Sequence, residues 1–174
     1  MGYRLLTGAR GRTLWDVSEP RNLGTSTPEG VYVGFLDALN RRDLDAASRW
    51  VDRGRYRENC VGFTKGFVGW QEATASLREV WKGLPDLHVD LASPAAAGDT
   101  VLAHGTVRGT NTGRLYGAPA TKRTYEASFF DYVRLEDGVI VEKVQQADVL
   151  GQMRQLYGRA FGLLGLGALL WRLP

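Results

Sequence analysis

The stretch FFDYVRLEDGVIVEKVQQAD, residues 129–148, determines the fold that the sequence predicts. Apolar and polar side chains alternate in its first half and again in its second half, which is the pattern of half-buried β-strands. Asp137-Gly138 lies between the two halves, and this dipeptide is typical of the tight turn that joins antiparallel strands. The stretch therefore predicts a hairpin with one face toward a core.

We predict a three-residue loop, 136–138, with Gly138 in the left-handed conformation. The strands then pair as follows: Leu135 with Val139, Val133 with Val141, Asp131 with Lys143, and Phe129 with Gln145. All eight side chains share one face of the sheet, as directly opposed residues do. Five of the eight are apolar, so this face is expected to point inward.

Asp131 is the unexpected member of the inward face. A buried carboxylate is costly unless it is paired, and the predicted register makes Lys143 its partner. One interpretation is a structural ion pair that orients the sheet. The other is the polar end of an apolar pocket, in which Asp131 accepts or donates a proton. The residues alone leave both interpretations open.

Composition excludes several classes of function. The chain has 174 residues, 44% of them hydrophobic, which is enough for one domain with a sizeable core. Its formal net charge of +3 is spread without a basic stripe, so we expect no nucleic-acid partner. Cys60 is the only cysteine, and neither histidine has a partner at ligand spacing, so we expect neither a disulfide nor a metal. The start lacks a secretory signal, and we expect a cytoplasmic protein.

The chain is expected to divide into three parts: a flexible N-terminal arm at residues 1–27, one domain at residues 28–158, and an apolar tail at residues 159–174. The tail contains the run AFGLLGLGALLW, residues 160–171, which is shorter than the roughly 20 residues that span a bilayer. We therefore expect no membrane span and predict that the tail packs on the domain or on a neighbouring subunit.

Helical periodicity precedes the strands. The first predicted helix begins at a Ser26–Glu29 capping box, and three further helices are predicted at residues 43–52, 70–84 and 149–157. The predicted strands before the hairpin are residues 87–91 and 101–108, with a turn at 95–100. Three helices followed by antiparallel strands, without βαβ alternation, indicate an α+β fold. Helices on one face of a curved sheet tend to leave a cavity, and such cavities bind small molecules.

Four segments together resemble the SnoaL-like polyketide cyclases: PDLHVDL (85–91), GTNTGRLYGAPATKR (109–123), YVRLEDGVIVE (132–142) and ADVLGQMRQLYG (147–158). Their order and spacing carry the resemblance, which covers about residues 28–158. It implies a cone-shaped α+β barrel of the ketosteroid-isomerase-like and nuclear-transport-factor-two-like type. In such a fold, three N-terminal helices pack on a curved, mainly antiparallel sheet that encloses a pocket.

The resemblance also implies chemistry. Family members close polyketide rings, often by an intramolecular aldol step, and use no metal and no cofactor. The family's best-known catalytic aspartate corresponds to Gln145 here, and an amide cannot remove a proton from carbon. We therefore expect Asp131 to transfer the proton, Lys143 to tune it, and Gln145 to bind a substrate carbonyl. The expected substrate-binding residues are Tyr32, Tyr56, Glu58, Asn59, Phe129, Val133 and Val141.

The predicted function is a cofactor-independent cyclase, active as a homodimer on a hydrophobic, oxygenated natural-product intermediate. One alternative is an isomerase or epoxide-opening enzyme of the same fold. Another is a non-catalytic small-molecule binding or resistance protein, which would return its ligand unchanged. A third is an interaction module that dimerises through the sheet and the apolar tail, and this alternative predicts no ligand-sized cavity.

Overall fold

The computed structural model describes residues 27–61, 66–92, 94–115 and 117–158. The predicted N-terminal arm, apart from Thr27, and the predicted apolar tail therefore lie outside the described residues. The helical segments are α1 (Pro28–Asn40), α2 (Leu44–Ala47), the 3-10 helix η1 (Ser48–Trp50), α3 (Trp70–Gly83) and α4 (Val149–Tyr157). The strands are β1 (Arg57–Val61), β2 (Phe67–Val68), β3 (His88–Leu91), β4 (Ala95–Ala97), β5 (Thr100–Thr110), β6 (Thr124–Glu136) and β7 (Val139–Ala147).

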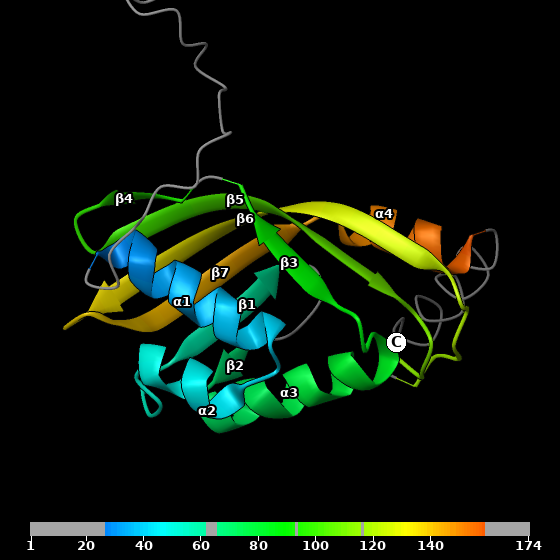
Figure 1. Cartoon of the computed structure of the whole chain (residues 1–174), viewed down its shortest axis with the longest axis horizontal. Helices are drawn as coiled ribbons and strands as arrows, with labels where there is room; N and C mark the ends of the chain where they lie inside the picture. The colour runs from blue at the N-terminus through cyan, green and yellow to red at the C-terminus, as the bar shows by residue number, and fades with distance from the viewer. Residues whose placement is uncertain (1–26, 62–65, 93, 116, 159–174) are drawn as a thin grey trace, which may run out of the picture.

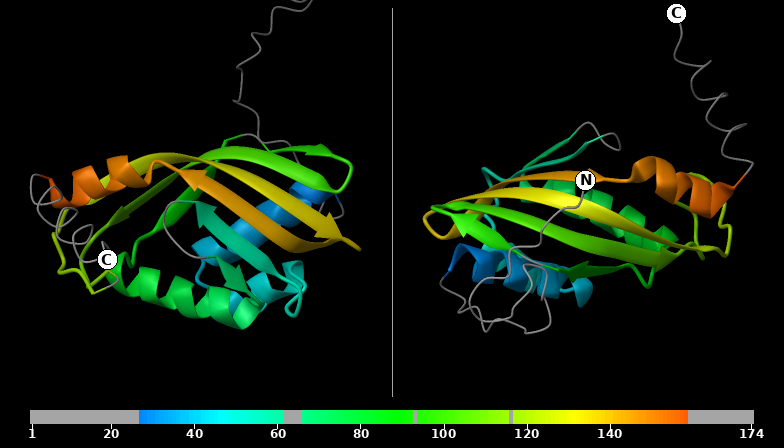
Figure 2. Two further views of the ribbon diagram at one scale, coloured as in Figure 1. Left: turned by 180° about the vertical axis from the view of Figure 1, so that it is seen from behind. Right: turned by 90° about the horizontal axis from the view of Figure 1, so that it is seen from above.

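The strands form one curved sheet in the order β2-β1-β7-β6-β5-β3, with β4 paired to β5. All neighbouring strands are antiparallel except β1 and β7, which are parallel. Helices α1, α2 and α3 lie along the concave side of the sheet, and α4 follows β7 at the end away from the β6–β7 turn (Figures 1 and 2). The predicted α+β architecture, with helices on a curved and mainly antiparallel sheet, is confirmed.

Local signals place most helices correctly and miss two details. The cap of α1 is Thr27, whose side chain accepts a hydrogen bond from the Gly30 backbone nitrogen at 3.1 Å, so the predicted cap at Ser26 is wrong. The Glu29 carboxylate accepts a hydrogen bond from the Ala96 nitrogen at 3.1 Å. Ala96 belongs to β4, which forms where we expected only a turn.

The β6–β7 hairpin corrects the predicted register. Asp137 and Gly138 both have positive φ angles, 51° and 76°, and Glu136 pairs with Val139 across this two-residue turn. Two left-handed residues in succession are the geometry of a type I′ turn, which makes the loop one residue shorter than expected. The actual pairs are Leu135 with Ile140, Val133 with Lys143, Asp131 with Gln145, and Phe129 with Ala147.

A register shift after Arg134 explains why the inward face nevertheless keeps Lys143 and Gln145. The shift leaves Val141 as an extra residue on β7, as in a β-bulge. Ile140 takes the place opposite Leu135 that we predicted for Val139, and it belongs to the main core cluster, whereas Val141 is buried outside that cluster. Along β6, residues 125 to 135 alternate buried and solvent-facing positions, with Asp131 among the buried ones.

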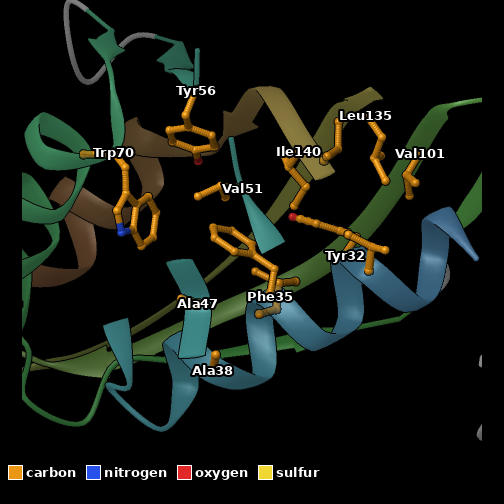
Figure 3. Close-up of a cluster of buried hydrophobic side chains, with 14 of the residues drawn as sticks. Tyr32, Phe35, Ala38, Ala47, Val51, Tyr56, Trp70, Val101, Leu135 and Ile140 are labelled. Atoms are coloured by element: carbon orange, nitrogen blue, oxygen red, sulfur yellow. The ribbon is translucent and has the colours of Figure 1, made fainter. Parts of the chain in front are cut away.

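The main core fills the space between α1 and the sheet. Tyr32, Phe35, Tyr56 and Trp70 contribute neighbouring rings whose centroids lie 5.6 to 6.4 Å apart (Figure 3). A second, smaller cluster lies at the α4 end and consists of Leu84, Leu115, Tyr125, Ala127 and Leu156. The concave face is therefore packed at two places, one under α1 and one beside α4.

Candidate active site

A cavity lies between the two packed regions, bounded by α3, α4 and the concave face of the sheet. Its wall is mainly aliphatic and includes Leu36, Leu77, Val80, Leu87, Val107 and Met153. Such a surface binds an apolar skeleton, because burying apolar area in it removes that area from water. Polar side chains are concentrated at particular points of this wall.

The strands β1 and β7 supply one group of polar side chains. In their parallel pairing, Glu58 is the partner of Lys143, and Cys60 is the partner of Gln145. Since alternate residues of a strand point to the same face, all four side chains share the concave face and line the cavity. Sequence reasoning named Glu58 as a secondary candidate and did not include Cys60, because nothing local in the sequence indicates that these two strands pair.

Lys143 is the centre of the polar group. Its ammonium lies 2.9 Å from the Glu58 carboxylate and 4.0 Å from the Asp131 carboxylate, and its side chain is only 6% exposed. Burial lowers the pKa of Lys143, but the two carboxylates raise it by more, so the net shift is upward. Lys143 is therefore a buried ammonium ion at neutral pH.

Asp131 lies behind this lysine and is fully enclosed by protein. The Tyr32 hydroxyl donates to its Oδ2, and the Gln145 amide nitrogen lies 3.5 Å from the same oxygen. Its Oδ1 has no hydrogen-bond partner among the described residues. Burial raises the pKa of Asp131, while Lys143 and the Tyr32 hydroxyl oppose the rise. The carboxyl group is not part of the cavity wall.

Glu58 is the carboxylate that does line the cavity. It accepts hydrogen bonds at 2.9 Å from both the Tyr56 hydroxyl and the Lys143 ammonium, and its side chain is 16% exposed. Burial, reinforced by the neighbouring carboxylates, raises the pKa of Tyr32 and of Tyr56 well above the usual tyrosine value. Both tyrosines therefore stay protonated and act as donors that hold the two carboxylates in place.

The other residues predicted for the site are dispersed. Phe129 and Val133 are buried on the same face of β6 as Asp131. Asn59 points to the opposite, exposed face of β1, and Val141 borders a different surface hollow beside Arg55 and Arg134. His104 lies on the outer face of the sheet, as expected, with its ring 4.7 Å from that of Phe130. The structure therefore brings together Tyr32, Tyr56, Glu58, Asp131, Lys143 and Gln145.

Two searches of the described ranges gave no further site. No three His, Cys, Asp or Glu side chains within them are grouped so that they could hold a metal ion. No helix within them is both long and apolar enough to cross a membrane.

Comparison with known proteins identifies a family. The sequence profile described as SnoaL-like polyketide cyclase matches residues 30–156. No protein with a curated function matches the chain significantly.

Solved structures show the same fold. A candidate SnoaL-like polyketide cyclase from Jannaschia sp. CCS1 has a TM-score of 0.69 at 19% identity, covering 75% of this chain and 92% of its own. The candidate polyketide cyclase IdmH from Streptomyces antibioticus has a TM-score of 0.64 at 21% identity, covering 74% and 97%. TsrD from Streptomyces laurentii has a TM-score of 0.63 at 25% identity, covering 73% and 92%.

Proposed function

Because the chain belongs to the SnoaL-like polyketide cyclase family, we propose that it closes a ring in a hydrophobic, oxygenated natural-product intermediate by acid/base catalysis. One observation carries the proposal: the mainly aliphatic cavity ends at an ion pair between the half-buried Glu58 and the buried Lys143, with the Gln145 amide beside it. A carboxylate that can take up a proton and an ammonium ion that can stabilise an oxyanion are the two groups that an aldol ring closure requires.

Glu58 is the proton acceptor in this proposal. It is the carboxylate on the cavity wall, and the Tyr56 hydroxyl fixes its direction. Asp131, for which the sequence predicted this role, is enclosed behind Lys143 and has no surface in the cavity. We assign Asp131 instead the role of a positioning residue, whose negative charge keeps Lys143 protonated.

The reaction begins when the Glu58 carboxylate removes a proton from a carbon next to a substrate carbonyl. Negative charge then develops on that carbonyl oxygen, where the Lys143 ammonium and the Gln145 amide stabilise it. The resulting carbanion attacks a second carbonyl carbon of the same molecule and forms the carbon–carbon bond of the new ring. The second oxygen takes the proton from Glu58. Substrate and product contain the same atoms, and no oxidant or reductant is needed.

The environment of Gln145 suits a donor of this kind. Its side-chain oxygen accepts a hydrogen bond from the Cys60 thiol, with the sulfur at 3.6 Å, and its nitrogen faces Asp131 at 3.5 Å. These two contacts orient the amide, since a thiol selects the oxygen and a carboxylate selects the nitrogen. The nitrogen carries a second hydrogen, which can be donated to a substrate oxygen on the cavity wall.

The test uses a small apolar ketone in place of the natural substrate. The chain is incubated with β-tetralone in deuterated buffer, and uptake of deuterium next to the carbonyl is followed by mass spectrometry. We expect exchange above the buffer rate, and Glu58→Gln should reduce it by about a hundred- to ten-thousand-fold, the usual size of general-base catalysis. Glu126→Gln, a change on the exposed face of β6, is the matched control. Equal exchange by the Glu58 variant and the parent would contradict the assignment.

A non-catalytic binding protein is the second candidate. It is supported by the hydrogen bonds and ion pairs that already connect Glu58, Lys143, Gln145 and Asp131 to one another. This function predicts that β-tetralone binds to the chain without deuterium uptake, and that any ligand retained through purification is recovered unchanged. The same experiment therefore separates a catalyst from a binder.

A further inference from the structure

The cavity has a second polar end, which the proposed chemistry does not use. Tyr125 from β6 and Gln152 from α4 both line the cavity. Tyr125 is only 6% exposed, yet its hydroxyl has no hydrogen-bond partner among the residues that the structure describes, and neither has the side-chain amide of Gln152. Neither group is among the buried polar atoms that lack a partner within the described ranges, and Gln152 is only half-buried, so both groups are accessible rather than enclosed. The two groups are therefore available to a bound ligand.

The second polar end is far from the first along the same strand. Tyr125 and Asp131 both face inward on β6, and Gln145 is directly opposite Asp131 on β7. Six residues separate positions 125 and 131, which corresponds to roughly 20 Å along an extended strand. Figure 1 shows the same relation, since α4 lies at the end of β6 opposite to the β6–β7 turn. A ligand that reaches both ends must be elongated.

The rest of the cavity wall is apolar apart from Ser76. Ala147, Val107, Leu84 and Leu156 lie along this part of the cavity. These side chains offer no hydrogen bonds, so they accept hydrocarbon and disfavour polar groups in the middle of a ligand. The pattern along the cavity is polar, apolar and polar.

The chemistry of Tyr125 selects the kind of oxygen that binds there. Burial, and after it the negative charge of Asp86, raises the pKa of Tyr125 well above its usual value. The hydroxyl therefore remains protonated and can either donate or accept a hydrogen bond. Because Asp86 lies nearby, an anionic ligand group is repelled, whereas a neutral hydroxyl or carbonyl is accepted.

We propose that Tyr125 and Gln152 form a second oxygen-binding subsite, so that the ligand is an elongated apolar skeleton with a neutral oxygen group at each end. This inference rests on the proposed function for the first end, where Lys143 and Gln145 bind the reacting oxygen. It adds the substrate class: an extended molecule, oxygenated at both ends, which an enzyme that adds or retains oxygen along a carbon chain must supply.

The experiment compares p-terphenyl with a hydroxyl group on one terminal ring and p-terphenyl with one on each terminal ring, placed para to the ring junctions. The two oxygens of the second probe lie on the order of 14 Å apart, and a hydrogen bond of about 3 Å at each end extends its reach to roughly 20 Å. Binding to the full chain is measured by calorimetry for the parent, Tyr125→Phe and the control Tyr157→Phe. Tyr157 is a half-buried tyrosine of the same region that does not line the cavity. Tyr125→Phe should weaken binding of the dihydroxylated probe by roughly three- to tenfold, the value of one hydrogen bond. Binding of the monohydroxylated probe should not change.

Three results would overturn the inference. In the first, Tyr125→Phe binds the dihydroxylated probe as tightly as the parent does. In the second, both probes lose affinity equally, which means that a single hydroxyl at Tyr125 suffices and the ligand is not two-ended. In the third, neither probe binds the parent chain. Because the assay needs no turnover, it can succeed even if Glu58→Gln leaves deuterium exchange intact, so the two proposals fail independently.

Discussion

Beneath α1 the concave face of the sheet is filled with side chains, whereas between α3 and α4 it borders a cavity. In the filled half, Asp131 is held by Tyr32 and lies close to Lys143. In the open half, the Tyr125 hydroxyl and the Gln152 amide have no partner among the described residues. The same strand, β6, thus carries a carboxyl group that the protein encloses beside its own donor and cation, and a hydroxyl group that it leaves to a ligand.

The boundary between the halves runs through the Lys143 ion pairs. Glu58 and Asp131 both lie near the ammonium, but only Glu58 lines the cavity. Two carboxylates that share one lysine therefore have different functions, because one is accessible to a ligand and the other is not. The difference shows that burial alone does not mark a catalytic acid or base, and that the side chain must also reach the reacting atoms.

Lys143→Met tests the boundary itself and should have the largest effect on stability. The change keeps an apolar chain of similar length but leaves Glu58 and Asp131 without their shared cation. Removing one partner of a buried ion pair costs about 3–5 kcal/mol, so the free energy of unfolding in urea should fall by that amount. Lys82→Met, at an exposed pair with Glu79 on α3, is the control and should change it by less than about 1 kcal/mol. A similar small loss for Lys143→Met would show that Lys143 does not hold the two carboxylates.

Asp131→Asn separates a stability role from a catalytic one. The pKa of Asp131 is raised in the folded protein, so the folded state holds this proton at pH values where the unfolded state has released it. Stability is therefore highest below the ordinary aspartate range near 3.8 and falls as pH rises through the folded pKa. Asp131→Asn should remove this decline, by about 1.4 kcal/mol for each unit by which the pKa is raised.

The measurement is urea unfolding of parent and variant from about pH 4 to pH 8. Deuterium exchange into β-tetralone is recorded on the same preparations without urea. The control is Asp37→Asn, at an exposed position of α1, which should keep the parental pH profile. The rate of deuterium exchange into β-tetralone per folded Asp131→Asn molecule should fall less than that of Glu58→Gln, because Glu58 still holds Lys143 protonated when the charge of Asp131 is lost. A well-folded Asp131→Asn variant that loses exchange by about a hundredfold or more would show that Asp131, rather than Glu58, carries the proton.

Sequence reasoning succeeded where the signal is local. The spacing of Trp70, Ala73, Leu77 and Leu84 predicted α3, and the alternation along β6 predicted which side chains face the core. It failed on the hairpin register, because Asp137 adopts a left-handed conformation that shortens the loop and Val141 forms an extra residue that shifts the pairing back. The two-residue turn could have been predicted from the Asp-Gly dipeptide, which favours a type I′ loop, whereas no local pattern gives the position of the extra residue on β7.

The candidate site was predictable only in part for a related reason. Asp131, Lys143 and Gln145 lie in one hairpin, so their shared face could be inferred from the alternation of residues. Glu58 and Cys60 reach them through a parallel pairing 85 residues away in the sequence, which no local pattern encodes. Tyr125 was missed because the missing partner of a hydroxyl is a property of the folded surroundings, and its sequence neighbours give no sign of it.

The smallest effect is expected at Cys60, which reports on the open half without a mutation. This thiol is half-buried, it lines the cavity, and it is the only cysteine of the chain. Burial raises its pKa, although Lys143 partly offsets the rise, so the reactive thiolate is scarce at neutral pH.

N-ethylmaleimide should therefore label the folded chain more slowly than the urea-unfolded chain, and the rate should still increase at pH values above the ordinary thiol range. Dihydroxylated p-terphenyl should slow labelling a further few-fold, because a ligand held at Lys143 and Gln145 covers the sulfur beside them. Adducts are counted by mass spectrometry, and glutathione in the same tube controls for direct consumption of the reagent. If saturating dihydroxylated p-terphenyl leaves the labelling rate unchanged, the probe does not occupy the polar end beside Glu58, and the contrast between the filled and the open half loses its functional meaning.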